Sequence, residues 1–413
     1  DTRPARLMTE ETSLTVANQW LVVLYSFLIQ AVGIGIAIYC FATFSLPWLD
    51  EFGASRRDVM LTTFWLQLAT GAFSPFVGYA MDRFPIRRMV LSGLVLLLLS
   101  VWLISLSGEL WHIWLIYASF LPLASTLLGN LAGQTLVVRA FKDKRGIAFG
   151  ISALGTNFGG LIFPLLAAAW IVDFGWRDAF VYVAFSAVLI ILPLTWLVFR
   201  NKEISHLMNP VLKTLEGEEA LTTKDIFRSL RFWIPVIGVV PLSMSFGAIQ
   251  FNLGGLVRDL GVVNDLGLTS QLTGVMVVCM MLGKLFYGGV GDRLDHRFLF
   301  WIANGLTGIA LVLVMMADSE RSLILGIIFL GLGTGGILPL LALTISSRFP
   351  IASFGRVMGL SAITIPMGAF SPVLAGWSYD LFGTYVYLFM ALLGVIALVS
   401  MMVRWLPKPS TVN

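Results

Sequence analysis

Two stretches of the chain resemble each other closely, GYAMDRFPIR at residues 78–87 and GGVGDRLDHR at residues 288–297. Both match the pattern G-x-x-x-D-R-x-x-x-R, and they lie 210 residues apart. A second matching pair follows, GISA at residues 150–153 and GLSA at residues 359–362, offset by 209 residues. Self-similarity at a fixed distance indicates an internal repeat. The chain is therefore expected to consist of two related halves.

Composition places these halves in a membrane. Of 413 residues, 58% are hydrophobic and only 12% are charged, against ~25% in a soluble domain. This excludes a soluble enzyme, a disordered chain and a disulfide scaffold. The net charge of +4 is small for this length, so no nucleic-acid partner is expected. Cys40 and Cys279 lie in apolar runs and the histidines lack neighbouring ligands, so we expect no metal site and no cofactor.

Apolar runs between charged and turn residues predict twelve transmembrane helices. They cover residues 20–46, 59–80, 89–106, 111–138, 146–172, 179–199, 232–257, 270–290, 298–316, 323–346, 357–379 and 384–403. The one long connection, residues 200–231, is polar and reads as a linker. The sequence thus predicts an all-α membrane protein with two six-helix parallel-repeat halves, residues 1–199 and 232–413, joined by a cytoplasmic linker.

The positive charges give the orientation. Of the 27 Lys and Arg residues, 21 fall on the side of the termini and linker, five fall on the other side, and Lys284 lies inside a span. Because cytoplasmic loops are rich in Lys and Arg, both termini are expected to be cytoplasmic. We expect a multi-pass protein of the plasma (inner) membrane, in contact with lipid and monomeric.

The doubled motif resembles the signature loop of the major facilitator superfamily, and the resemblance extends over the whole chain. Its glycine allows close helix approach, and its aspartate can accept hydrogen bonds from a neighbouring helix N-terminus. In that family these contacts tie the halves together on the cytoplasmic side. The resemblance therefore implies gating roles for Asp82, Arg83, Arg87, Arg139, Asp292, Arg293 and Arg297.

Within the superfamily, the chain is most similar to the monocarboxylate porters and the oxalate/formate antiporter. Four short stretches carry this similarity: residues 39–58, residues 141–150 with FKDKRGIAFG, residues 175–177 with GWR, and residues 283–288 with GKLFYG. The family commonly has Gly-Arg where this chain has Gly283-Lys284. The resemblance implies transport of a small organic acid by alternating access.

Lys284 is the main candidate for binding a substrate. It lies eight residues before Asp292, or ~12 Å along a helix, close to the middle of a hydrocarbon layer whose half-thickness is ~15 Å. A charge there normally faces a water-filled cavity, although it could also snorkel or pair with an acid. In the family, the arginine of span eight binds the substrate carboxylate. Lysine is a point charge instead of a planar fork, and residues 357–379 lack the antiporter's second cation, which favours a monoanion.

Polar residues on the spans that line the cavity in this superfamily are further candidates. Each could instead form hydrogen bonds between helices, because polar groups inside a membrane need partners. These residues are Gln30, Tyr39, Asn130, Gln134, Gln250 and Asn252.

These features together predict a secondary transporter of a small organic anion, with no covalent step and hence no enzymatic activity. Coupling could be proton symport or anion exchange, because Lys284 can change its protonation when its surroundings change. The alternative is an efflux pump for drugs or other lipophilic solutes, which would favour an acidic residue in the cavity. A membrane enzyme or a channel would need clustered titratable groups or a selectivity filter, which the sequence does not show. Among transporters, a carrier of phosphate esters or of nitrate is a further alternative.

Overall fold

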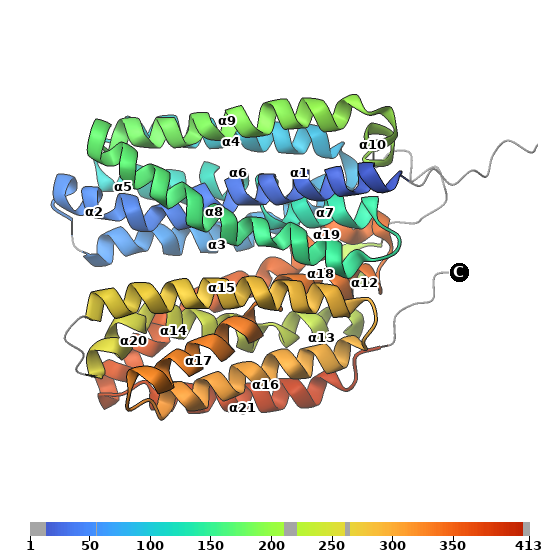
Figure 1. Ribbon diagram of the computed structural model, residues 1–413. Coiled ribbons are helices and arrows are strands. Elements are labelled where there is room, and N and C mark those ends of the chain that lie inside the picture. Colours follow the sequence, from blue (N-terminus) through green and yellow to red (C-terminus); the bar gives the residue numbers. More distant parts are fainter. Residues whose placement is uncertain (1–13, 55, 210–220, 261–264, 408–413) are drawn as a thin grey trace, which may run out of the picture.

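The computed structural model describes residues 14–54, 56–209, 221–260 and 265–407. Over these ranges the chain is helical, with no strand. Short parts of the predicted halves and linker, residues 1–13, 210–220, 261–264 and 408–413, lie outside the described residues. Figure 1 shows two bundles side by side, the first ending with α9 (Trp176–Arg200) and the second beginning with α13 (Leu230–Gly238).

The first bundle contains six membrane-length units. Its remaining elements are α1 (Val16–Ile34), the π-helical η1 (Gly35–Tyr39), α2 (Cys40–Phe52), α3 (Arg56–Arg83), α4 (Ile86–Ser105), α5 (Leu110–Tyr117), α6 (Phe120–Leu128), α7 (Asn130–Ala140) and α8 (Arg145–Phe174). The second bundle continues with α14 (Val240–Asp259), α15 (Asp265–Gly291), α16 (His296–Met315), α17 (Glu320–Thr334), α18 (Ile337–Ser346), η2 (Ile351–Ser353), α19 (Phe354–Ser361), η3 (Ala362–Thr364), α20 (Ile365–Phe382) and α21 (Val386–Val403). The all-α fold predicted from the sequence, in two repeated halves, is confirmed.

Among the described residues, eleven helices are long and apolar enough to cross a membrane. The second predicted span, residues 59–80, is not one of them; it lies in α3, which has 28 residues but a more polar composition. This helix packs against α19 and α20 of the second bundle. Because part of α3 faces another helix pair in place of lipid, it can carry polar residues that a lipid-facing helix avoids.

Several predicted spans are interrupted, which the hydropathy pattern did not reveal. The fourth consists of α5, α6 and α7, with Gly129 at φ −92° and ψ −143° between the last two. The seventh is divided between α13 and α14, with a proline at the start of α14, and the tenth between α17 and α18 at Gly335–Gly336. Proline removes a backbone donor, and Gly129 adopts dihedrals outside the helical region, which glycine tolerates. Gly335 and Gly336 keep right-handed helical dihedrals. None of these interruptions changes the apolar character of the span.

The linker contains two short helices, α10 (Lys202–Leu207) and α12 (Thr223–Phe227). In Figure 1 they lie at the end of the molecule where α1 begins and α21 ends. We refer to this end as the linker end, and to the other as the opposite end.

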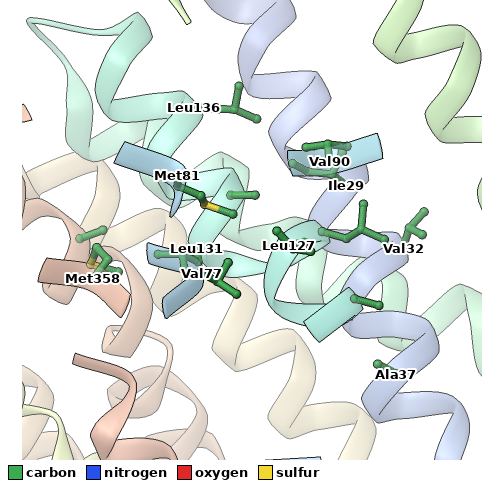
Figure 2. Close-up of a cluster of buried hydrophobic side chains, with 14 of the residues drawn as sticks. Ile29, Val32, Ala37, Val77, Met81, Val90, Leu127, Leu131, Leu136 and Met358 are labelled. Atoms are coloured by element: carbon green, nitrogen blue, oxygen red, sulfur yellow. The ribbon is translucent and has the colours of Figure 1, made fainter. Parts of the chain in front are cut away.

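Buried apolar side chains hold the helices together across the two bundles. Figure 2 shows one cluster, to which α1 contributes Ile29 and Val32, and α3 contributes Val77 and Met81. Met358 of α19 belongs to the same buried cluster, although it comes from the second bundle. The two bundles therefore share a packed apolar interface on the α3 side.

Candidate functional site

The side chain of Lys284 in the second bundle forms hydrogen bonds with the first bundle. It lies on α15, is 3% exposed, and its Nζ donates to oxygens of α8. The partners are the carbonyl oxygen of Ala153 at 2.9 Å, the Thr156 hydroxyl at 2.6 Å and Asn157 Oδ1. These three partners are uncharged. An ammonium removed from water therefore has hydrogen bonds here, but no counter-charge among these partners.

The close contact of α8 and α15 depends on small residues. A Cβ added to Gly150 would lie 2.7 Å from the backbone oxygen of Lys284. One added to Gly288 would lie 2.6 Å from the carbonyl oxygen of Gly146 and 2.8 Å from the Cα of Gly150. The two backbones are therefore in direct contact, as is typical of small-residue helix crossings in membranes. This contact brings Lys284 within reach of α8.

Asp292 joins the same two helices, α8 and α15, by hydrogen bonds at the linker end. Its carboxylate oxygens accept from the backbone N–H of Gly146, at the start of α8, at 2.8 and 2.9 Å. Burial raises the pKa of Asp292, and the N–H groups of Gly146 and Ile147 partly oppose this shift. A carboxylate at a helix N-terminus meets unpaired N–H groups and the positive end of the helix dipole.

Asp82 makes the matching contact between α3 and α19, also at the linker end. Its Oδ1 accepts from the N–H of Gly355 at 2.9 Å, and its Oδ2 from the N–H of Arg356 at 2.7 Å. These donors belong to α19, so the carboxylate of the first bundle binds the second, whereas Asp292 does the reverse. The internal repeat thus generates two reciprocal contacts that join the halves at the linker end.

Two of the motif arginines make local contacts. The Arg83 guanidinium lies over the ring of Tyr79, with its carbon 4.2 Å from the ring centroid. Arg297 donates from Nε to the carbonyl oxygen of Leu406 at 2.9 Å, which secures the segment after α21. The side chains of Arg87 and Arg293 are exposed.

Arg139 of α7 is buried and connects α3 of the first bundle with the linker. It donates to the carbonyl oxygens of Met81 at 2.8 Å and of Met208 at 3.1 Å, just beyond α10. The sequence analysis did not single out its repeat equivalent, Arg348, 209 residues later. Arg348 is 3% exposed and donates to the carbonyl oxygen of Pro407 at 2.9 Å. The offset of the repeat could have identified it.

Gln30 lies at the contact of α1, α7 and α8. Its Nε2 donates to Ser152, with 3.0 Å to the carbonyl oxygen and 2.5 Å to the hydroxyl. The Ser26 hydroxyl of the same helix contacts the Ser152 hydroxyl at 2.5 Å and donates to the carbonyl oxygen of Gly133 at 2.9 Å. This hydroxyl and amide network joins three helices of the first bundle.

Asn130 and Gln134 lie one turn apart on α7. Gln134 is fully buried, and both atoms of its amide lack a hydrogen-bond partner in the described part of the chain. Asn130 Oδ1 and, on α14, Gln250 Oε1 are also buried without a partner in that part. Such groups are rare, since most buried polar atoms are hydrogen-bonded. These three amides have capacity for a further partner.

The remaining two candidates have contacts within their own bundle. Asn252 donates from Nδ2 to the carbonyl oxygens of Ala248 at 2.9 Å and Pro372 at 3.4 Å. Tyr39, the last residue of η1, lies against Gly160 of α8, where an added Cβ would come within 2.8 Å of the ring.

The opposite end carries a second polar cluster, inside the first bundle. Glu51, at the end of α2, forms an ion pair with Arg177 and accepts from the indole N–H of Trp176. Arg177 also donates to the carbonyl oxygens of Ser105 at 3.1 Å and Ser107 at 2.8 Å. These bonds join α2, α4 and α9.

The sequence analysis missed Thr156 and Asn157, because it looked for substrate contacts on other spans. A signal was present: the pair stands in a mostly apolar run, about two turns beyond Gly150. Nothing local in the sequence relates this pair to Lys284, which follows 127 residues after Asn157.

Two repeated helix bundles, joined by reciprocal contacts at one end, are typical of membrane transporters built from parallel repeats. The family model of the Major Facilitator Superfamily matches residues 25–268 and 236–413. The chain belongs to this superfamily and is an integral membrane protein. Its membership explains the doubled motif.

Relatives within the superfamily differ in what they carry. The chain is 25% identical to the MFS-type transporter YcxA of Bacillus subtilis over 92% of its own length and 95% of the relative. It is 26% identical to the multi-drug resistance efflux pump PmrA of Streptococcus pneumoniae, over 75% and 76% of the two chains. Monocarboxylate transporter 6 of Mus musculus is 22% identical, over 90% of this chain and 82% of the relative.

Solved structures agree with the fold. The proton:xylose symporter XylE, bound to 6-bromo-6-deoxy-D-glucose, superposes with a TM-score of 0.76. The match covers 95% of this chain and 97% of XylE at 13% identity, so it shows the architecture alone.

Proposed function

We propose that this protein transports a small organic anion, most simply a monocarboxylate, and that Lys284 provides the positive charge that binds it. The ammonium of Lys284 carries this proposal, because it is buried between the two halves with uncharged partners. A carboxylate would give this buried cation a counter-charge, which its three present partners do not provide.

The gating role of the linker end is part of this proposal. Asp82 and Asp292, supported by the arginines of the motif and by Arg139, stabilise the state closed at that end. The excess of Lys and Arg there supports a cytoplasmic location of the linker end in the plasma membrane. Substrate would then enter from the opposite end and leave after the two carboxylates release α8 and α19.

Coupling is proposed to run through Lys284, by proton symport or by exchange of one anion for another. An ammonium gains stability when an anion arrives and loses it when the anion leaves. Asn130, Gln134 and Gln250, whose buried amide atoms lack partners among the described residues, are proposed as further substrate contacts. Gln30 Oε1 is also buried without a partner in the described chain and is proposed as a contact of the same kind. Tyr39 is proposed as an aromatic contact, whereas Asn252 Nδ2 could contribute only by exchanging its present hydrogen bonds.

The relationship to PmrA favours a second candidate, efflux of drugs or other lipophilic solutes. The two functions make opposite demands on charge. A carrier of lipophilic cations benefits from an acidic group at membrane depth, whereas Lys284 is a cation there. The similarity to monocarboxylate transporter 6 supports the first candidate.

Counterflow of a labelled monocarboxylate into proteoliposomes tests this proposal. Lys284→Gln should abolish counterflow, and Lys284→Arg should retain part of it because the charge is kept. Lys202→Gln, on the exposed surface of α10, serves as the control and should transport normally. Full counterflow by monodisperse Lys284→Gln protein would overturn the proposal.

A further inference from the structure

Asn157 uses one half of its amide and leaves the other half free. Its Oδ1 accepts from Lys284, whereas its Nδ2 is buried and has no acceptor in the part of the chain that the structure describes. The whole residue is 1% exposed. Both atoms belong to one amide group, so this N–H donor lies within a few ångströms of the ammonium. Two donors, one of them charged, therefore lie side by side.

Thr156 contributes in a different way. Its hydroxyl donates to the carbonyl oxygen of Ala153 at 2.9 Å, so its proton is already used. Toward Lys284, at 2.6 Å, the hydroxyl therefore acts as an acceptor. Thr156 can hold the ammonium, but in this arrangement it has no proton to offer an anion.

The pseudo-equivalent interface shows that helix packing does not require this polar set. There, a Cβ added to Gly359 would lie 2.4 Å from the backbone oxygen of Ser74. In the same way, a Cβ added to Gly150 would lie 2.7 Å from the backbone oxygen of Lys284. Ser74 thus occupies the position of Lys284, and its hydroxyl donates within its own helix, to Thr70 at 2.6 Å. The repeat offset places Ile365 and Pro366 where α8 has Thr156 and Asn157. Glycine contacts and an aspartate close both interfaces, but the cation and the amide occur at one.

Building on the proposed carboxylate transport, we propose that Asn157 is a second substrate ligand and that substrate displaces the α8 oxygens from Lys284. One carboxylate oxygen accepts from Lys284 Nζ and the other from Asn157 Nδ2. The three hydrogen bonds that Lys284 makes to α8 all cross between the halves. Exchange of these bonds for bonds to substrate replaces direct contacts between the halves with contacts that run through the substrate. Substrate thereby bridges α15 and α8 at the level of Lys284.

Two neighbouring substitutions should change substrate affinity in opposite directions. Asn157→Leu removes a donor to the carboxylate and should weaken binding about tenfold. Thr156→Val removes a competitor for the ammonium, so binding should stay equal or become a few-fold tighter. Asn304→Leu, in the buried core of α16, is a matched control and should leave affinity unchanged. Isothermal titration of the purified full chain with acetate, lactate and pyruvate measures each affinity.

The affinities of these variants distinguish failure of this inference from failure of the proposed function. If the unsubstituted protein binds none of the carboxylates, both fail. If it binds them and Lys284→Gln does not, while Asn157→Leu retains full affinity, this inference alone fails. Equal losses in Thr156→Val and Asn157→Leu would also overturn it, because they would show a merely structural role for both residues.

Discussion

Replacing Gly288 with alanine should open the linker end by forcing α8 and α15 apart. The added Cβ would lie 2.6 Å from the carbonyl oxygen of Gly146, whereas ordinary contacts begin near 3.4 Å. The helices α8 and α15 therefore have to separate by about 0.8 Å at this point. The neighbouring Gly289 has open space around its Cβ position, so Gly289→Ala is a control on the same helix with the same gain in helix propensity.

The magnitude follows from the bonds next to this contact. The Asp292 carboxylate accepts from the Gly146 N–H at 2.8 and 2.9 Å, and a separation of this size lengthens both bonds beyond the ~3.2 Å of a good N–H···O bond. A hydrogen bond to a charged group contributes about 1.5–3 kcal/mol. Since 1.4 kcal/mol is a factor of ten, the closed state should lose about tenfold to hundredfold in population relative to the open state.

Distances between spin labels on the two halves measure this population. Ser205 lies on the linker helix α10, which packs against α7 and α9 of the first half, and Leu294 follows α15 of the second half. Both are exposed at the linker end and can carry the labels after replacement by cysteine. Cys40 and Cys279, both buried, are first replaced by alanine. Gly288→Ala should shift the distances to longer values, and Gly289→Ala should not. Equal distributions for the two variants would refute the proposed closure.

Two further predictions concern charged groups at either end. Asp82→Asn weakens the bonds to the N–H groups of α19, so transport should slow several-fold while the carboxylate Kd stays within a few-fold; loss of binding would contradict a gating role. Desolvation raises the pKa of Glu51, but hydrogen bonds from Trp176 and Arg177 and the charge of Arg177 outweigh it, so the net pKa is lowered. The ion pair therefore stabilises the fold above the ordinary glutamate pKa of ~4.3 and loses this effect as the pH falls through the lowered value. The difference in Tm between wild type and Glu51→Gln should be small at pH 7 and vanish in acid; a difference that grows in acid would contradict this assignment.

The architecture could be predicted because it depends on periodic and repeated features of the sequence. Apolar runs of membrane length, charge asymmetry and the duplicated motif each act independently of side-chain packing. The interruptions at Gly129 and Gly335 were not visible, because these residues leave the average hydropathy of their spans unchanged. The predicted span at residues 59–80 is a helix, α3, although it is more polar than the other spans. Its contacts with the other half replace contacts with lipid, so it can carry these polar residues.

Part of the surroundings of Lys284 could be predicted. Its place inside an apolar span follows from its distance to Asp292 along one helix, and the structure has it buried in the candidate span of residues 271–291. Its partners do not, because they depend on the register of α15 against α8, which the contacts of Gly150 and Gly288 determine. For the same reason the sequence could not show that Gln30 bonds with Ser152, or that Gln134 lies buried without a partner in the described chain.

The central claim is that a buried lysine binds an anionic substrate, and paired ligands of matched shape test it most directly. The thermal stability of the purified protein is measured with lactate and with lactamide, its uncharged analogue, and with a lipophilic cation. A rise in Tm with lactate that is absent with lactamide, and lost in Lys284→Gln, is the predicted result. Equal stabilisation by the acid and the amide, or stabilisation by the lipophilic cation alone, would contradict the account.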